Sequence, residues 1–172
     1  MLRWIGGFMI LAGSLGLGIW YREQFRQRLV LIRILTEILE MLISEVRYGK
    51  TALPECCRNV GMQTKEPFKG AMLGVFKKMQ QNSGEGFQEI FCTYMERAMA
   101  ETALEKEEKE EFLRFVKQGS FADGEMQIRG MEQSRDMLLA LRGRLEKMTE
   151  EKGRLAVGLG AMSGLLLIIV LL

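Results

Sequence analysis

Two long runs without a charged residue lie at the ends of the 172-residue sequence, at residues 4–21 and 155–172. Each run holds 18 residues, which make a helix of about 27 Å at 1.5 Å per residue. Because the hydrocarbon core of a bilayer is roughly 30 Å thick, each run is just long enough to cross it. The sequence therefore predicts transmembrane helices within residues 1–21 and 155–172, with residues 22–154 as a separate domain between them.

Each run also has an alternative interpretation. The first could be a signal peptide, but no small-x-small cleavage site precedes Trp20 and Tyr21, and its aromatic residues lie where membrane-interface aromatics are common. The second could be a buried helix of a globular domain. Its last nine residues, "GLLLIIVLL", are more uniformly apolar than such a helix needs to be. Two membrane anchors are therefore favoured.

Basic residues next to the two runs predict the orientation in the membrane. They are Arg22, Arg26, Arg28 and Arg33 after the first run, and Arg142, Arg144, Lys147, Lys152 and Arg154 before the second. Because positive charge stays on the cytoplasmic side, we expect the middle domain in the cytoplasm and both termini across the membrane. The three cysteines of such a domain are expected to be free thiols.

The middle domain is predicted to be an antiparallel bundle of about six helices, which makes the fold class all-α. From residue 24 to 48, Leu31, Leu35, Ile38, Leu42 and Val46 follow helical spacing, and charged residues occupy the opposite face. Gly49 is expected to end this helix in a left-handed conformation. Further helices are expected from Thr51 or Leu53 to near Gly61, and at about 65–81, 87–100 and 103–117.

The sixth predicted helix starts after Asp123, which is a good N-cap residue. Its apolar positions recur at alternating steps of three and four residues, the pattern of a helix-packing seam. The seam consists of Met131, Ser134, Leu138, Leu141, Leu145, Met148, Lys152 and Leu155. Since no proline interrupts the first or the sixth helix, each is expected to continue into its uncharged run.

Composition argues against several kinds of chemistry. The sequence has no histidine, which excludes histidine-based catalysis and most zinc sites. Its net charge of +2 argues against nucleic acid as a partner. Gly49-Lys50-Thr51 resembles the end of a phosphate-binding loop, but Ser44 replaces the glycine that such a loop requires. We therefore expect a protein that is not an enzyme and has no cofactor, metal site or small-molecule substrate.

Two further features have both a structural and a functional interpretation. Cys56 and Cys57 diverge by about 100° on a helix, so one is expected to pack inward and the other near an edge. The glutamate-rich stretch "ETALEKEEKEEF", residues 101–112, is a solvated helix start or a docking face for a basic partner. Its candidate face consists of Glu105, Glu107, Glu108, Glu110 and Glu111.

Small residues follow one face of the last uncharged run. Ala156, Gly160 and Gly164 lie one helical turn apart, and stripes of this kind let helix backbones approach closely in lipid. They predict packing between membrane spans, either within one chain or between chains, although glycine is also common in spans for other reasons.

Three segments resemble the stage III sporulation protein AB family of endospore-forming bacteria. They are "LISEVRYGKTALPECCRNVG" at residues 42–61, "FVKQGSFADGEMQ" at 115–127 and "RLAVGLGAMSGLLLIIVLL" at 154–172. Six residues match the family motifs: Glu45, Tyr48, Leu53, Pro54, Asp123 and Gln127. Gly49 lies next to Tyr48 and is included in the candidate site. The family's usual proline directly after the threonine is displaced here to Pro54, and no histidine follows Gln127.

The resemblance implies a function. The family is similar to the helical platform domain of type II secretion and type IV pilus machines. It implies a non-enzymatic platform subunit in the mother-cell membrane facing the forespore. Its partners would be the other proteins of the stage III sporulation A complex, including a cytoplasmic secretion-type ATPase, with self-association open. The matching residues would form an elbow of the bundle or a partner contact.

A second hypothesis comes from another functional class. A chain with two membrane spans could act alone, as a holin-like or membrane-remodelling protein. The size of the polar middle domain argues against that interpretation. Permeability of vesicles that carry only this protein distinguishes the two hypotheses.

Overall fold

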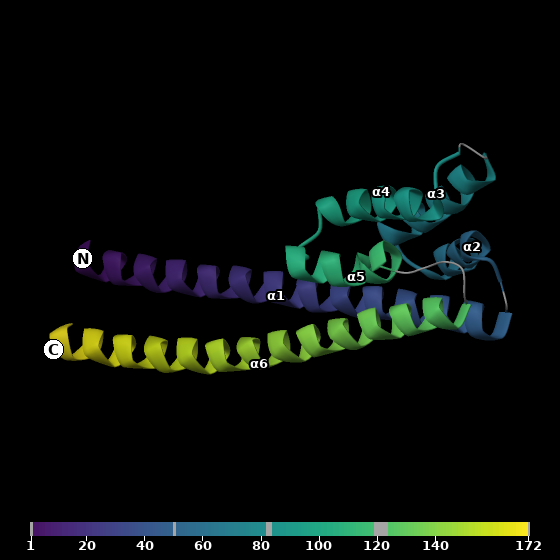
Figure 1. Cartoon of the computed structure of the whole chain (residues 1–172). Helices are drawn as coiled ribbons and strands as arrows, with labels where there is room; N and C mark the ends of the chain where they lie inside the picture. The colour runs from purple at the N-terminus through teal and green to yellow at the C-terminus, as the bar shows by residue number, and fades with distance from the viewer. Residues whose placement is uncertain (1, 50, 82–83, 119–123, 172) are drawn as a thin grey trace. The chain divides into compact units, whose positions relative to one another are not determined.

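The structure is a computed structural model that describes the backbone of residues 2–49, 51–81, 84–118 and 124–171. Side chains are described within 23–149, except residues 24, 50, 82–83 and 119–123. This part of the chain forms six helices and no strand, which confirms the all-α class (Figure 1). The helices are α1 (Leu2–Gly49), α2 (Leu53–Gln63), α3 (Phe68–Gln80), α4 (Phe87–Ala100), α5 (Lys106–Gln118) and α6 (Gly124–Leu171).

The first and last helices are long. Each has 48 residues, so the prediction that they continue into the uncharged runs is confirmed. The chain divides into two compact units, one formed by Met1–Leu29 with Gly143–Leu172 and the other by Val30–Arg142. Among the residues with described side chains, no helix combines the length and apolarity needed to cross a bilayer. The predicted spans lie outside those residues and stay a prediction.

Two helices begin three residues later than predicted, and both have a local reason. We expected the third helix from Lys65, but α3 begins at Phe68, directly after Pro67. Proline disfavours helical conformation in the residue before it, so the helix cannot include Glu66. We expected the fifth helix from Ala103, but α5 begins at Lys106. There the Glu108 carboxylate accepts a hydrogen bond from the backbone N–H of Glu105 at 2.8 Å, as in one half of a capping box.

The core of Val30–Arg142 is built from the faces that the sequence pattern indicated. On α1, Leu35, Ile38 and Leu42 are buried, while Leu31 and Val46 are half-buried. The opposite stripe is exposed, and Nε of Arg33 lies 2.9 Å from Oε1 of Glu37. On α6 the seam residues Met131, Ser134 and Leu138 are buried, and Leu141 is half-buried. In the other unit, Leu145 is buried and Met148 is exposed. Lys152 and Leu155 lie outside the described side chains.

Three phenylalanine rings join α4 to α5. The ring of Phe91 lies 6.2 Å from that of Phe112 and 5.6 Å from that of Phe115, between centroids. Phe112 and Phe115 pack edge to face at 6.3 Å. Phe91 and Phe112 are fully buried, and Phe115 is almost so. Aromatic pairs at these separations add stability beyond the area that they bury.

Glycines allow close approach between neighbouring helices. A Cβ at Gly61 would lie 3.0 Å from the Cβ of Met72, where α2 packs on α3. A Cβ at Gly74 would lie only 2.5 Å from Cε1 of Tyr94, where α3 packs on α4. Such distances are shorter than van der Waals contact, so the ring occupies space that a larger residue at position 74 would need.

Candidate interaction site

The candidate site begins at the last turn of α1, which holds Glu45, Tyr48 and Gly49. Tyr48 is 79% exposed, the highest value among the exposed large hydrophobic residues described. A buried tyrosine normally finds a partner for its hydroxyl, whereas an exposed one offers both a ring and a hydroxyl to another molecule. The hydroxyl of Tyr48 interacts with the neighbouring Arg47, while its exposed ring can form a contact outside the chain.

Gly49 does not adopt the conformation that we predicted. It is the last residue of α1 and does not have a positive φ, so the prediction of a left-handed end is wrong. Its lack of a side chain has another explanation. A Cβ at Gly49 would lie 2.6 Å from Oγ1 of Thr51. The glycine thus makes room for a close approach of the next residues.

One carboxylate fixes α2 against the end of α1. The Oε2 atom of Glu45 accepts a hydrogen bond from the side-chain amide of Asn59 at 2.8 Å. At the start of α2, Leu53 is buried and Pro54 occupies the first turn, where its missing N–H costs no helical hydrogen bond. These contacts give Glu45, Leu53 and Pro54 structural roles at the α1–α2 connection.

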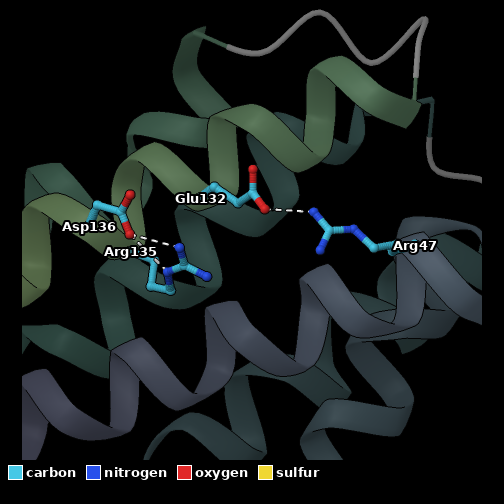
Figure 2. A network of polar contacts seen from close by, with 4 residues as sticks. All are labelled: Arg47, Glu132, Arg135 and Asp136. Atoms are coloured by element: carbon cyan, nitrogen blue, oxygen red, sulfur yellow. Dashed lines mark hydrogen bonds and ion pairs between the residues drawn. The ribbon is translucent and has the colours of Figure 1, made fainter.

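An ion pair joins the end of α1 to α6. Nη2 of Arg47 lies 2.6 Å from Oε1 of Glu132, and Figure 2 shows the two side chains pointing toward each other. The pKa of Arg47 is raised, mainly by the hydrogen bond to Glu132. Figure 2 also shows that Arg135 is held on its own helix, where it donates to Oδ1 of Asp136 at 2.8 Å from Nη2 and 3.0 Å from Nε.

Sequence reasoning missed both members of this ion pair. Arg47 belongs to a stripe that the pattern assigned to solvent, and Glu132 lies 85 residues further along the chain. The only local signal for Arg47 is a charged residue close to a helix end, and such residues are common on surface helices. Arg47 lies within the first motif segment, residues 42–61, whereas Glu132 lies on α6 just beyond the second segment, residues 115–127.

The structure describes the remaining predicted residues only in part. Gln127 is half-buried in the first turn of α6. Asp123, which was predicted to cap α6, lies outside the described residues, although the helix does begin at Gly124. The side chains of Ala156, Gly160 and Gly164 also lie outside the described residues, so their role in span packing stays a prediction.

The glutamate-rich stretch is less uniform than its sequence suggests. Glu108 is only 1% exposed and serves the start of α5, so it is not part of a docking face. Glu111 lies 3.1 Å from Arg114, and Glu110 lies 3.6 Å from Lys106. The candidate acidic face thus loses one of its five members to the interior, and local cations partly neutralise two others.

Cys56 and Cys57 both pack inside the domain. Each is fully buried, so the prediction that one lies near an edge is wrong. Burial raises the pKa of Cys56 to about 11 and also raises the pKa of Cys57. The Cys56 thiol lies 3.4 Å from the carbonyl oxygen of Thr51. Both thiols are therefore protonated at neutral pH, and reactive cysteines require the thiolate.

No group of three or more metal-ligating residues lies together in the described part of the chain. The arrangement at the end of α1 combines an exposed aromatic ring with surface carboxylates and guanidinium groups. Such a set can bind another protein through shape and hydrogen bonds.

Comparison with known proteins places the chain among sporulation proteins. The family model described as stage III sporulation protein AB matches residues 3–172. The chain belongs to the stage III sporulation protein AB family. This confirms the resemblance seen in the three sequence segments and identifies the family as one of sporulation proteins.

A solved structure of stage III sporulation protein AB (SpoIIIAB) has a similar fold. The match has a TM-score of 0.64 at 19% sequence identity, and it covers 72% of this chain and 97% of that chain. At this identity the likeness concerns the fold. A search of curated proteins found no match.

Proposed function

We propose that this protein is a non-enzymatic platform subunit of the membrane complex that links mother cell and forespore during sporulation. The observation that carries the proposal is the family match over residues 3–172, which includes the helical domain and both uncharged runs. The similarity of this family to the platform domains of secretion machines then supplies the role. The two uncharged runs anchor the chain in the mother-cell membrane, and the helical domain faces the cytoplasm.

The end of α1 is the surface that we assign to a partner in this complex. Tyr48 is exposed there, while the neighbouring Glu45, Arg47 and Leu53 are engaged in contacts within the chain. Because the neighbouring side chains are already engaged, the ring of Tyr48 is the main group there that a partner can bury. The partner proposed for this surface is the cytoplasmic secretion-type ATPase of the complex.

Binding of the detergent-solubilised full-length protein to that ATPase tests the assignment. Tyr48→Ala is expected to weaken binding by roughly tenfold or more, since aromatic anchors dominate many interfaces. Leu139→Ala is the matched control, because Leu139 is an exposed apolar residue on α6. Equal binding by the wild type and both variants contradicts the site. Absence of any binding removes the ATPase as a direct partner.

Topology is a separate test of the proposed anchoring. Cysteine-accessibility labelling in cells is expected to place residues 22–154 on the cytoplasmic side, because positive charge flanks both runs on that side. Single cysteines at exposed positions such as Ser44 and Gln133 serve as probes in a variant without native cysteines. Labelling of these positions from the outer side contradicts the orientation and excludes a cytoplasmic ATPase as partner.

A further inference from the structure

Charge is divided unevenly between neighbouring parts of the helical domain. Residues 51–81, which contain α2 and α3, hold five basic and two acidic residues. Residues 84–118, which contain α4 and α5, hold five basic and nine acidic residues. The first segment therefore carries a net charge of +3 and the second a net charge of −4. A domain that is nearly neutral overall thus has two parts of opposite charge.

The excess positive charge of residues 51–81 lies on three exposed lysines. Lys65, Lys69 and Lys77 are exposed and form no ion pair with any residue that the structure describes. Most other basic residues of Val30–Arg142 are paired with a carboxylate. Those paired residues are Arg33, Arg47, Arg58, Lys78, Lys106, Arg114, Lys117, Arg129 and Arg135.

Partly exposed apolar groups lie between these lysines. On α3, Leu73 follows Lys69 by four residues and Phe76 follows it by seven, so the three lie on one face of the helix. The side chains of Leu73 and Phe76 are half-buried. The guanidinium group of Arg58 from α2 lies 5.3 Å from the centre of the Phe76 ring. We call the set Arg58, Lys65, Lys69, Phe76 and Lys77 the basic strip. It combines unpaired charge with apolar surface, as protein interfaces do.

The complementary surface is present in the same sequence. Glu101, Glu107 and Glu110 are exposed around the α4–α5 connection, with Glu110 also close to Lys106 at 3.6 Å, and we call them the acidic corner. Among the described residues, the ion pair that joins the two charged segments within one chain is Lys78 with Glu85, at 3.3 Å. It involves neither the unpaired lysines of the basic strip nor the acidic corner.

We infer that the basic strip of one copy of this protein binds the acidic corner of a second copy. The two surfaces differ, so the contact is head to tail, and each copy keeps one strip and one corner available. Repetition of such a contact gives a ring when the rotation closes and an open chain when it does not. This inference does not depend on the ATPase contact at Tyr48.

Sedimentation of the full-length protein in mild detergent, at increasing salt, tests the inference. Association is expected near 0.05 M salt and is expected to weaken toward 0.5 M, because the Debye length falls from about 10 Å at 0.1 M to about 3 Å at 1 M. The Lys69→Glu, Lys77→Glu variant is expected to self-associate at least tenfold more weakly. The Glu101→Lys, Glu107→Lys variant is expected to show the same loss.

Mixing the two reversed variants gives the decisive result. Each supplies the charge that the other lacks, so the mixture is expected to associate again although neither variant does alone. Arg33→Glu with Arg129→Glu is the control for the lysine variant, since it lowers the net charge by the same amount at exposed residues elsewhere. Circular dichroism checks that each variant is folded.

Three results overturn the inference. A full-length protein that stays monomeric at low salt shows that the basic strip has a different occupant, such as an acidic segment of another protein. Association that persists in the reversed variants and at high salt shows that other surfaces, such as the terminal helices, hold the copies together. Loss in both variants without recovery in the mixture also contradicts a strip-to-corner contact.

Discussion

The α4–α5 contact and the end of α1 join helices in opposite ways. Between α4 and α5 the contact is apolar, and the rings of Phe91, Phe112 and Phe115 are buried in it. At the end of α1 the joining contacts are polar, with Glu45 bound to Asn59 and Arg47 paired with Glu132.

This difference separates stability from recognition. Burial of apolar surface is the main source of folding free energy, whereas partly exposed ion pairs contribute little. The α4–α5 contact therefore contributes to the stability of the domain, and the polar side chains at the end of α1 can change with little loss of stability. A surface of the second kind suits partner binding, because its side chains are not needed by the core.

The largest predicted effect concerns the aromatic contact. Phe112→Ala is expected to reduce the free energy of unfolding by about 3–5 kcal/mol, because it removes a buried ring and leaves a cavity. Chemical denaturation followed by circular dichroism measures the change. A loss below about 1 kcal/mol would show that the α4–α5 contact is not a main source of stability.

The next effect concerns the close approach of α3 and α4. Gly74→Ala adds a methyl group where the ring of Tyr94 already lies, and overpacking costs about 1–3 kcal/mol. When Tyr94 is also replaced by alanine, the same Gly74→Ala change is expected to stabilise the helix by up to about 1 kcal/mol, from helix propensity alone. A double-mutant cycle measures the coupling. Equal effects in the two backgrounds would contradict the contact.

A smaller effect concerns the buried thiol beside the polar end of α1. The pKa of Cys56 is about 11 in the folded chain, above its ordinary value of 9.0, so the unfolded chain loses this proton first as pH rises. Its contribution to stability is present below pH 9 and is lost as pH rises through 11. The free energy of unfolding, measured by chemical denaturation between pH 8 and 11, should decline less steeply in Cys56→Ala than in the wild type. Parallel declines would contradict the role of this thiol.

The smallest effect is predicted for the polar contacts themselves. Arg47→Ala is expected to cost less than about 1 kcal/mol, because both partners are partly exposed and exposed pairs contribute little. Thermal unfolding measures it, and Arg33→Ala, which breaks a pair within α1, is the control. A loss near that of Phe112→Ala would remove the distinction between the two contacts.

Much of the fold could be predicted from sequence because helical spacing reports burial directly. The pattern on α1 and α6 identified buried residues such as Leu35 and Leu138 from their neighbours alone. The starts of α3 and α5 were predicted three residues too early. The local signals at Pro67 and Glu105 were present in the sequence, but the prediction gave more weight to the apolar pattern.

The candidate site was less predictable because it depends on long-range contacts. Tyr48 and Leu53 could be named from the family resemblance, but Asn59 and Glu132 could not, since nothing local pairs them with Glu45 and Arg47. The conformation of Gly49 was also mispredicted, because the reason for a glycine there is the nearby hydroxyl of Thr51. Cys57 was buried by the packing of α2, which a helical angle alone cannot show.

The 85-residue separation between Arg47 and Glu132 has a consequence for the order of folding. Closing so long a loop is entropically costly, so contacts between neighbouring helices in the chain are expected to form first. The α1–α6 pair then forms after the rate-limiting step. Arg47→Ala should speed unfolding and leave the folding rate nearly unchanged in stopped-flow experiments. Amide hydrogens in the last turn of α1 should also exchange before those of α4, so the surface that carries Tyr48 would be the last to order and the first to open.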